Sequence, residues 1–152
     1  MNRLCRTLLA DVDEAADAVQ DVFARLHRAL ATETRRMDWG AWLTRVALNV
    51  CRDRRRSGWW GWWRQRGMEI DEARLTTLRT PEDEIVGRET QRRIWEAYRR
   101  LPARQREVFA LRRVDGRSGA EVAELLGVGE GTVKRHLFRA VHTLRRTLKE
   151  PQ

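Results

Sequence analysis

Apolar residues recur at intervals of three and four positions along nearly the whole chain, and no stretch shows the alternation of a half-buried strand. One such face comprises Val19, Val22, Phe23, Leu26 and Leu30. A second comprises Trp39, Trp42, Leu43, Val46 and Val50. Two of the three prolines, Pro81 and Pro102, stand where they would separate helices. The sequence therefore predicts an all-α fold.

The pattern divides the chain into two helical parts. A first helix is expected at about 2–9. A second runs from the acidic start at 11–14 to about residue 30, and a third follows a loop at 31–38 and ends at residue 56. Further helical segments follow at about 82–100 and 103–114, and two helices close the chain. Residues 57–89 interrupt the regular pattern. We therefore expect two small helical domains, 1–56 and 90–152, joined by a flexible linker.

Charge limits the classes of function. The formal net charge of the 152-residue chain is +9, and the basic excess grows toward the C-terminus, which favours nucleic acid or an anionic membrane surface as partner. No apolar run is long enough for a membrane span and no signal-peptide pattern opens the sequence, so we expect a cytoplasmic protein. Cys5 and Cys51 match no metal or redox spacing and are interpreted as free thiols. Because no metal, nucleophile–base or phosphate-loop motif is present, neither a cofactor nor catalysis is expected.

Residues 118–146 have the pattern of a helix-turn-helix. Ser118 and Glu121 have the spacing of a capping box, which marks the start of a helix. Gly127-Val128-Gly129 then forms a tight turn, in which Gly127 can adopt a positive φ while Val128 turns toward the core. A second helix begins near Glu130.

The second of these helices has two different faces. Its apolar side comprises Val133, Leu137, Leu144 and Leu148, and the opposite side is basic. From Thr132 to Lys149 there are six basic residues and no acidic one. The alternative is a solvated charged face on a helical core, which this asymmetry makes the weaker interpretation. A DNA-recognition helix does, with early residues at base edges and flanking cations at phosphates. Its predicted DNA-contacting residues are Thr132, Lys134, Arg135, Phe138 and Arg139.

Taken together, these segments resemble the extracytoplasmic-function (ECF) class of bacterial sigma factors, which are RNA polymerase subunits with two helical domains called regions two and four. The resemblance covers nearly the whole chain. In the first half it rests on the segments 17–23 (DAVQDVF) and 42–56 (WLTRVALNVCRDRRR). In the second half it rests on 101–108 (LPARQREV) and 131–135 (GTVKR). It implies a non-enzymatic initiation factor that binds core RNA polymerase, through the β′ clamp helices and the β flap, and promoter DNA, and that is regulated by an anti-sigma protein.

The resemblance also implies roles for residues of the first half. Asp17, Gln20 and Asp21 would contact the polymerase, unless they form a plain amphipathic surface, while Phe23 would face the core. Arg45, Asn49, Arg52 and Arg56 lie on one polar ridge of the helix that, by this resemblance, would open and read the minus-ten element. The Asn49 amide suits an unstacked base edge, although a solvent-facing asparagine is the simpler alternative. Trp39 belongs to the loop that would hold a flipped base, or packs at the start of its helix.

The cluster Trp59-Trp60-Gly61-Trp62-Trp63 is too apolar to remain exposed at low cost. Three interpretations stay open: it folds back on the first domain, docks on a partner such as polymerase or an anti-sigma protein, or sits at a membrane interface beside Arg64 and Arg66. The family usually has about one further helix ahead of the first residue of this chain.

Two other classes of function remain as alternatives. The first is a stand-alone helix-turn-helix regulator whose N-terminal half serves dimerisation or sensing, which would bind a symmetric duplex site without polymerase. The second is a helical protein of the membrane surface, which would bind liposomes through its tryptophan and arginine side chains.

Overall fold

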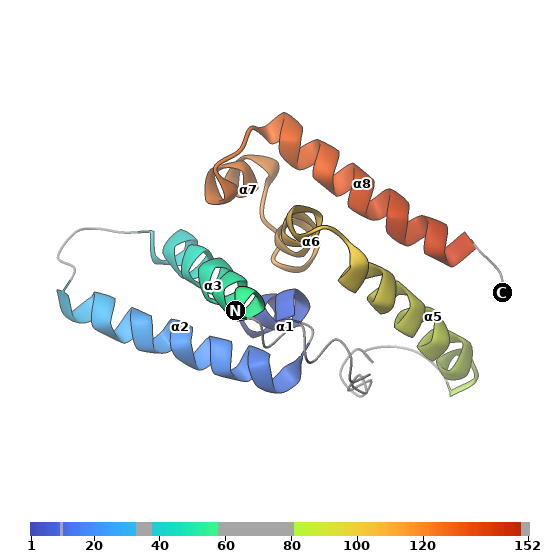
Figure 1. The fold of residues 1–152 in the computed structure, drawn as a ribbon, viewed down its shortest axis with the longest axis horizontal. Coiled ribbons are helices and arrows are strands. Elements are labelled where there is room, and N and C mark those ends of the chain that lie inside the picture. The colour runs from blue at the N-terminus through green and yellow to red at the C-terminus, as the bar shows by residue number, and fades with distance from the viewer. Residues whose placement is uncertain (10, 33–37, 58–80, 150–152) are drawn as a thin grey trace.

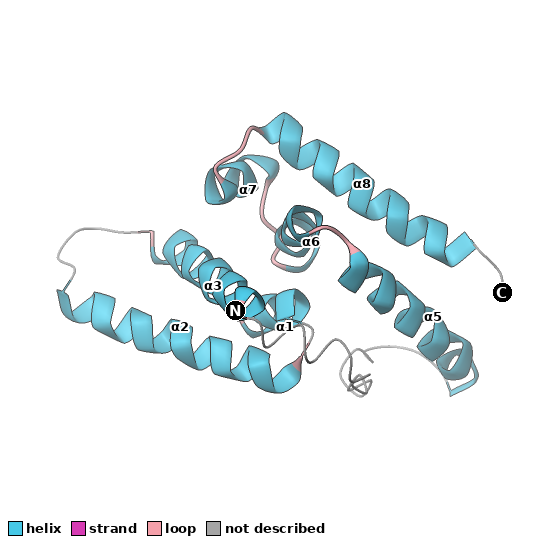
Figure 2. Cartoon of the chain, in the orientation of Figure 1, coloured by secondary structure: helices cyan, strands magenta, loops and turns pink. Residues whose placement is uncertain are grey.

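The structure is a computed structural model that describes residues 1–9, 11–32, 38–57 and 81–149. Within these ranges every regular element is helical, which confirms the all-α prediction (Figure 2). The first half contains α1 (Asn2–Leu9), α2 (Val12–Thr32) and α3 (Trp39–Arg56). The second contains α5 (Pro81–Arg100), α6 (Ala103–Phe109), the π-helical turn η2 (Ala110–Val114), α7 (Gly119–Leu126) and α8 (Glu130–Lys149). The tryptophan cluster of 59–63 lies outside the described residues.

Side-chain caps fix where the helices of the first half begin. Asp11 Oδ1 accepts a hydrogen bond from the backbone N–H of Glu14 at 2.7 Å, which confirms the expected acidic start of α2. Asp38 caps α3 in the same way, accepting from the N–H of Ala41 at 3.0 Å. Both α2 and α3 pack on α1.

The buried side of α2 differs from the predicted one. Small residues, Ala15 and Ala18, share it with Val22, and they allow α1 and α3 to approach closely. Phe23 is 52% exposed and Leu30 is 56% exposed, so the expectation that Phe23 faces the core was wrong. Phe23 follows Val22 by one residue, which turns it about 100° away from the buried stripe.

The buried side of α3 is also shifted from the predicted stripe. Of that stripe only Val50 is fully buried, and the other four residues are half-buried. The core is completed instead by Thr44, Ala47, Leu48 and Cys51. The Cys5 and Cys51 thiols are both buried, and the neighbouring Cys5 thiol together with burial raises the pKa of Cys51.

In the second half, α6 begins directly after Pro102, as predicted. The segment expected to be one helix over 103–114 changes at Ala110 into a π-helical turn, in which the N–H of Asp115 donates to the carbonyl of Ala110. The helix-turn-helix is confirmed in detail. Ser118 and Glu121 form the capping box, and Gly127 ends α7 at φ 65° and ψ 41°.

The two halves share one apolar core, contrary to the expectation that each would pack by itself. Figure 1 shows α6 at the centre of the molecule, with α1–α3 on one side and α5 and α8 on the other. Val108, Ala110 and Leu111 belong to the same buried cluster as Leu4 and Leu48 of the first half. A second cluster joins α5 to α8 and consists of Tyr98, Leu101, Ala140 and Leu144. Separate cores would each be small, and fusing them removes additional apolar surface from water.

In the described part of the chain, no helix is long and apolar enough to cross a membrane.

Candidate nucleic-acid interface

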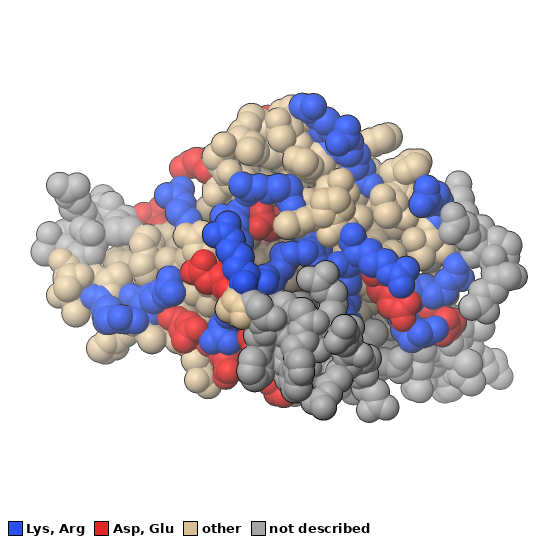
Figure 3. All heavy atoms as spheres, viewed as in Figure 1, with Lys and Arg blue, Asp and Glu red and all other residues tan. Residues whose placement is uncertain are grey.

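The turn before α8 fixes which of its faces is outermost. The Gly129 carbonyl accepts hydrogen bonds from the N–H groups of Thr132 and Val133, and the Val133 side chain is almost fully buried. The residues that follow therefore point outward. Lys134, Arg135 and Arg139 are exposed, Phe138 is 69% exposed, and Thr132 is half-buried. Figure 3 shows basic side chains in a row along the outer side of α8. All five residues predicted for this helix are thus brought together.

One residue of this face was not singled out from the sequence. The ring of His142 stacks on that of Phe138, with centroids 6.2 Å apart and an angle of 25° between the planes. His142 is exposed one helical turn after Phe138, and an i, i+4 aromatic pair is the signal that could have indicated it. The pair gives the basic face a flat aromatic surface, which suits contact with a base or a sugar.

The polar ridge of α3 forms the second candidate surface. Arg45, Asn49 and Arg56 are exposed, as the ridge requires. Arg52, by contrast, is half-buried and therefore less exposed than these three residues, and its Nη1 donates to Asn49 Oδ1 at 3.4 Å. Trp39 is half-buried at the start of α3, and its ring meets that of Trp42 edge-on at 5.6 Å. The loop that would complete a base pocket, 33–37, is outside the described residues.

Arg52 is occupied by a carboxylate from the other half of the chain. Its Nε donates to Glu107 Oε1 at 2.7 Å and its Nη2 to Glu107 Oε2 at 2.9 Å. Arg104 donates to Glu107 Oε2 at 3.1 Å. Glu107 is only 3% exposed, and burial opposes its ionisation, but the two guanidinium groups outweigh burial and hold the pKa of Glu107 below its ordinary value.

Sequence reasoning missed the role of Glu107, although a signal exists. Glu107 precedes the buried Val108 and lies four residues before the buried Leu111. A charged residue on an apolar stripe must have a partner, because an unpaired buried charge is costly. The spacing thus indicates a buried ion pair, but it does not identify Arg52, which is 55 positions away.

A second contact joins the helix-turn-helix to the start of α3. Arg117 Nη2 donates to the Thr44 hydroxyl at 2.8 Å and to the Gly40 carbonyl at 3.3 Å. Asp115 and Glu121, at 3.0 and 3.2 Å, hold the same guanidinium in place and raise the pKa of Arg117. Thr44 is 3% exposed, so this contact is sheltered from solvent.

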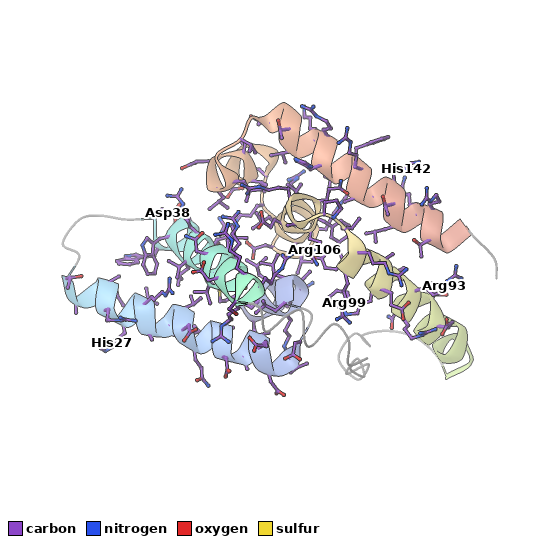
Figure 4. The ribbon with its side chains drawn as sticks, in the orientation of Figure 1. His27, Asp38, Arg93, Arg99, Arg106 and His142 are labelled. Atoms are coloured by element: carbon purple, nitrogen blue, oxygen red, sulfur yellow. The ribbon has the colours of Figure 1, made fainter. Side chains whose placement is uncertain are left out.

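In Figure 4, Arg106 lies at the middle of the molecule, where its Nη1 donates to the Arg99 carbonyl at 2.8 Å.

The residues predicted to bind the polymerase lie along α2. Asp17, Gln20 and Asp21 are all exposed. Arg54 of α3 donates to Asp21 at 2.7 Å and to Glu14 at 2.9 Å, and lies 3.9 Å from Asp17. These carboxylates raise the pKa of Arg54. The surface is therefore a strip of acids with one arginine among them, a feature that residue spacing on α2 does not reveal.

The fold and these surfaces together define a helical DNA-binding protein. It has a helix-turn-helix in its second half and, on α3 of its first half, a polar ridge that is also suited to DNA. The family description "Sigma-70 region 2" matches residues 2–61, and "Sigma-70, region 4" matches residues 91–144. These bounds lie near the predicted domain limits.

Relatives and solved structures agree with this assignment. The ECF RNA polymerase sigma factor SigL of Mycobacterium tuberculosis is 35% identical, over 97% of this chain and 82% of SigL. BldN of Streptomyces coelicolor is 34% identical over 90% of this chain, which spans about half (51%) of BldN. The sigma factor RpoE in complex with the anti-sigma factor NepR, from Bartonella quintana, has a similar fold. Its TM-score is 0.69 at 23% identity, covering 99% of this chain and 91% of that one.

The chain belongs to the ECF class of RNA polymerase sigma factors. This confirms the resemblance read from the sequence, and it makes the chain a transcription initiation factor rather than an enzyme.

Proposed function

We propose that this chain acts in the cytoplasm as a sigma factor that binds core RNA polymerase, brings it to promoter DNA and opens the minus-ten element. One observation carries the proposal: a chain of this family has two separate exposed surfaces suited to DNA, on α8 and on α3. A stand-alone regulator needs only the first of them. Opening of the strands is the step that requires the second.

In this proposal α8 reads the minus-thirty-five element. Lys134, Arg135 and Arg139 offer donors for guanine edges and for phosphates, while Phe138 supplies an apolar contact to a base or a sugar. Thr132, near the start of the helix, contacts the backbone. The buried Val133 supports this role because it fixes the rotation of α8 about its own axis.

The ridge of α3 reads the minus-ten element once its strands have separated. Asn49 pairs with the edge of an unstacked base, because its amide has both donors and an acceptor. Arg45, Arg52 and Arg56 follow the phosphates, and Trp39 stacks on the extruded base. The exposure of Arg45 and Asn49 supports this assignment.

The acidic strip on α2 is the surface for the polymerase. Asp17, Gln20 and Asp21 contact the β′ clamp helices, and the helix-turn-helix domain contacts the β flap. We also assign this chain an anti-sigma partner, supported by the similar sigma factor that was solved with NepR. An anti-sigma protein would act by covering the same surfaces.

The test is to reconstitute the purified chain with core polymerase and to sequence the 5′ ends of the transcripts made from genomic DNA. A sigma factor gives starts that share two upstream elements and that vanish when the chain is omitted. Unchanged starts, together with polymerase-independent protection of a symmetric duplex, would instead identify a stand-alone regulator. Unchanged starts with binding to anionic liposomes would identify a protein of the membrane surface.

A further inference from the structure

We propose that two copies of this chain pair in antiparallel orientation through an apolar stripe on the outer side of α2, and that the paired form cannot bind the polymerase. This outer stripe consists of Val12, Ala16, Val19, Phe23, Leu26 and Leu30. The pairing itself does not depend on the proposed function. The exclusion of the polymerase rests on it, because it assumes that the acidic strip of α2 is the docking surface.

The outer stripe is exposed in the described part of the chain. Phe23 is 52% exposed, Leu30 is 56% exposed and Val12 is 37% exposed. They are three of the four large hydrophobic residues that are exposed within the described ranges. Figure 1 shows α2 at one edge of the molecule, with α3 on its inner side. Exposed apolar residues that gather on one face indicate a surface for a partner.

The spacing of the outer stripe is that of a seam between two helices. From Val12 to Leu30 its residues follow one another at intervals of four, three, four, three and four positions. These are the intervals of the a and d positions of a coiled coil, which keep side chains in line along a helix. At 1.5 Å per residue the stripe is about 27 Å long. The helix therefore offers close to three heptads to a second helix.

Charge favours a second copy of the same chain as that partner. The first half of α2 has no basic residue and has four acids, which are Asp13, Glu14, Asp17 and Asp21. The second half has no acid and has three basic residues, which are Arg25, His27 and Arg28. An antiparallel copy places each acidic half beside the basic half of the other helix, whereas a parallel copy would place like charges together.

The sizes of the side chains also fit the antiparallel arrangement. The intervals read the same from both ends, so a two-fold axis at position 21 brings each stripe residue opposite another one. The three resulting pairs are Val12 with Leu30, Ala16 with Leu26, and Val19 with Phe23. In every pair the residue from the first half of α2 is the smaller one. Small side chains facing large ones fill such a seam without voids.

Residues beside the outer stripe are compatible with the same register. Asp13, Gln20 and His27 each follow a stripe residue by one position, and all three are exposed. In the antiparallel pair Asp13 lies near His27 of the second copy, and the two Gln20 amides lie near each other. Figure 4 shows His27 on the side of α2 that faces away from α3. Because Gln20 also belongs to the acidic strip, the pair covers part of the surface assigned to the polymerase.

The experiment measures self-association of the full chain by sedimentation equilibrium. Between about 1 and 200 µM, the range of weak association, we expect the mean mass to rise from one chain toward two. It should rise no further, because a two-fold pair is closed. Phe23→Ser removes a ring from the centre of the seam, and the exposure of Phe23 means that the fold should persist, as checked by circular dichroism. Since symmetry removes the ring twice, the dissociation constant should increase roughly a hundredfold or more.

A matched variant separates the seam from general stickiness of the surface. Phe138→Ser makes the same change at a phenylalanine that is 69% exposed on α8, and it should leave the dissociation constant unchanged.

A charge exchange tests the orientation. His27→Glu places a carboxylate near Asp13 of the second copy and should weaken pairing about several-fold. Adding Asp13→Lys should restore the pairing, because each new lysine then lies near a new glutamate. In a parallel pair these two positions are far apart, and no rescue would occur.

A wild-type chain that stays monomeric throughout this range would overturn the proposal, since something other than a second copy would then cover the stripe. Equal losses in Phe23→Ser and Phe138→Ser would overturn it as well, because they indicate unspecific apolar association. Failure of Asp13→Lys to rescue His27→Glu would exclude the antiparallel orientation.

Core polymerase is then added to the paired chain, and the complexes are separated by sedimentation velocity. We expect the pairs to disappear as complexes with one chain per polymerase form. Complexes that contain two chains would overturn the exclusion of the polymerase from the paired form. A chain that pairs but binds no polymerase contradicts the proposed function and leaves the pairing intact.

Discussion

Replacing Gly127 by alanine isolates the backbone requirement of the helix-turn-helix. Gly127 ends α7 with φ 65° and ψ 41°, and the N–H of Val128 returns to the Ala123 carbonyl at 3.0 Å. A Cβ at this position would meet no atom within 4 Å, so the substitution causes no clash. Its whole effect comes from the left-handed conformation, which costs an L-residue about 1–2 kcal/mol. Part of this is offset because alanine lowers the entropy of the unfolded chain, and the expected net loss is about 1 kcal/mol.

Gly131→Ala is the matched control, only four residues away. Gly131 lies in the first turn of α8, has no positive φ, and would also place its new Cβ in open space. Alanine at a helical position should therefore stabilise the protein by about 0.5–1 kcal/mol. The same added methyl group is thus expected to have opposite effects at the two sites.

Urea denaturation followed by circular dichroism measures both changes. With a slope of about 1–3 kcal/mol per molar urea, the midpoints should move by roughly 0.5 M in opposite directions from wild type. A shift of both variants in the same direction would refute the reasoning, because it would mean that the methyl group acts through contacts that the structure does not contain.

Three further predictions address the surfaces. Asn49→Ala should retain polymerase binding but lose strand opening, which is measured as the permanganate reactivity of promoter thymines. A template mismatched across the minus-ten element should restore this reactivity. Normal strand opening by the variant would show that Asn49 does not read the minus-ten element. Arg135→Ala or Arg139→Ala should each weaken promoter binding by about 1–3 kcal/mol if the side chain contacts a base, whereas the exposed Arg25→Ala in the other half should not. Because the folded-state pKa of Glu107 is below its ordinary value of 4.5, its stabilising effect is full above that value and is lost as the pH falls through the folded-state pKa. The difference in urea midpoint between wild type and Glu107→Gln should therefore shrink from pH 7 to about pH 3, and a constant difference would argue against the ion pair.

The helix-turn-helix was predictable because local rules determine it. The capping box of Ser118 and Glu121 and the left-handed Gly127 each depend on residues within a few positions, and both are found as expected. The outward face of α8 followed from the same periodicity, since Val133 and Leu144, both predicted on its apolar side, are buried and set its rotation.

The burial of Phe23 was predicted wrongly because helical periodicity does not decide which of two neighbouring apolar faces of α2 is buried. Two stripes on α2 differ by one residue, and the one with larger apolar side chains was preferred. The protein buries the stripe with Ala15 and Ala18, because the closeness of α1 and α3 favours small residues. That choice depends on tertiary packing, which spacing along α2 does not contain.

The polar contacts between the halves lay beyond sequence reasoning for a different reason. Arg52 was placed correctly on the ridge of α3, but its partner comes from α6. Thr44 and Arg117 are likewise 73 positions apart. Such pairs depend on how two separately recognisable regions pack together, and a single sequence carries no pattern at that separation.

The shared core has a consequence for how such a chain can evolve. Leu111 and Val108 of the second family region pack in the same cluster as Leu4 and Leu48 of the first, so a change of volume on one side alters the fit of the other. The two regions therefore cannot be exchanged between relatives as independent modules without repacking this seam. Homologues that keep this shared core should show compensating substitutions between these two groups of positions. In homologues without it, the residues at the two groups of positions should vary independently.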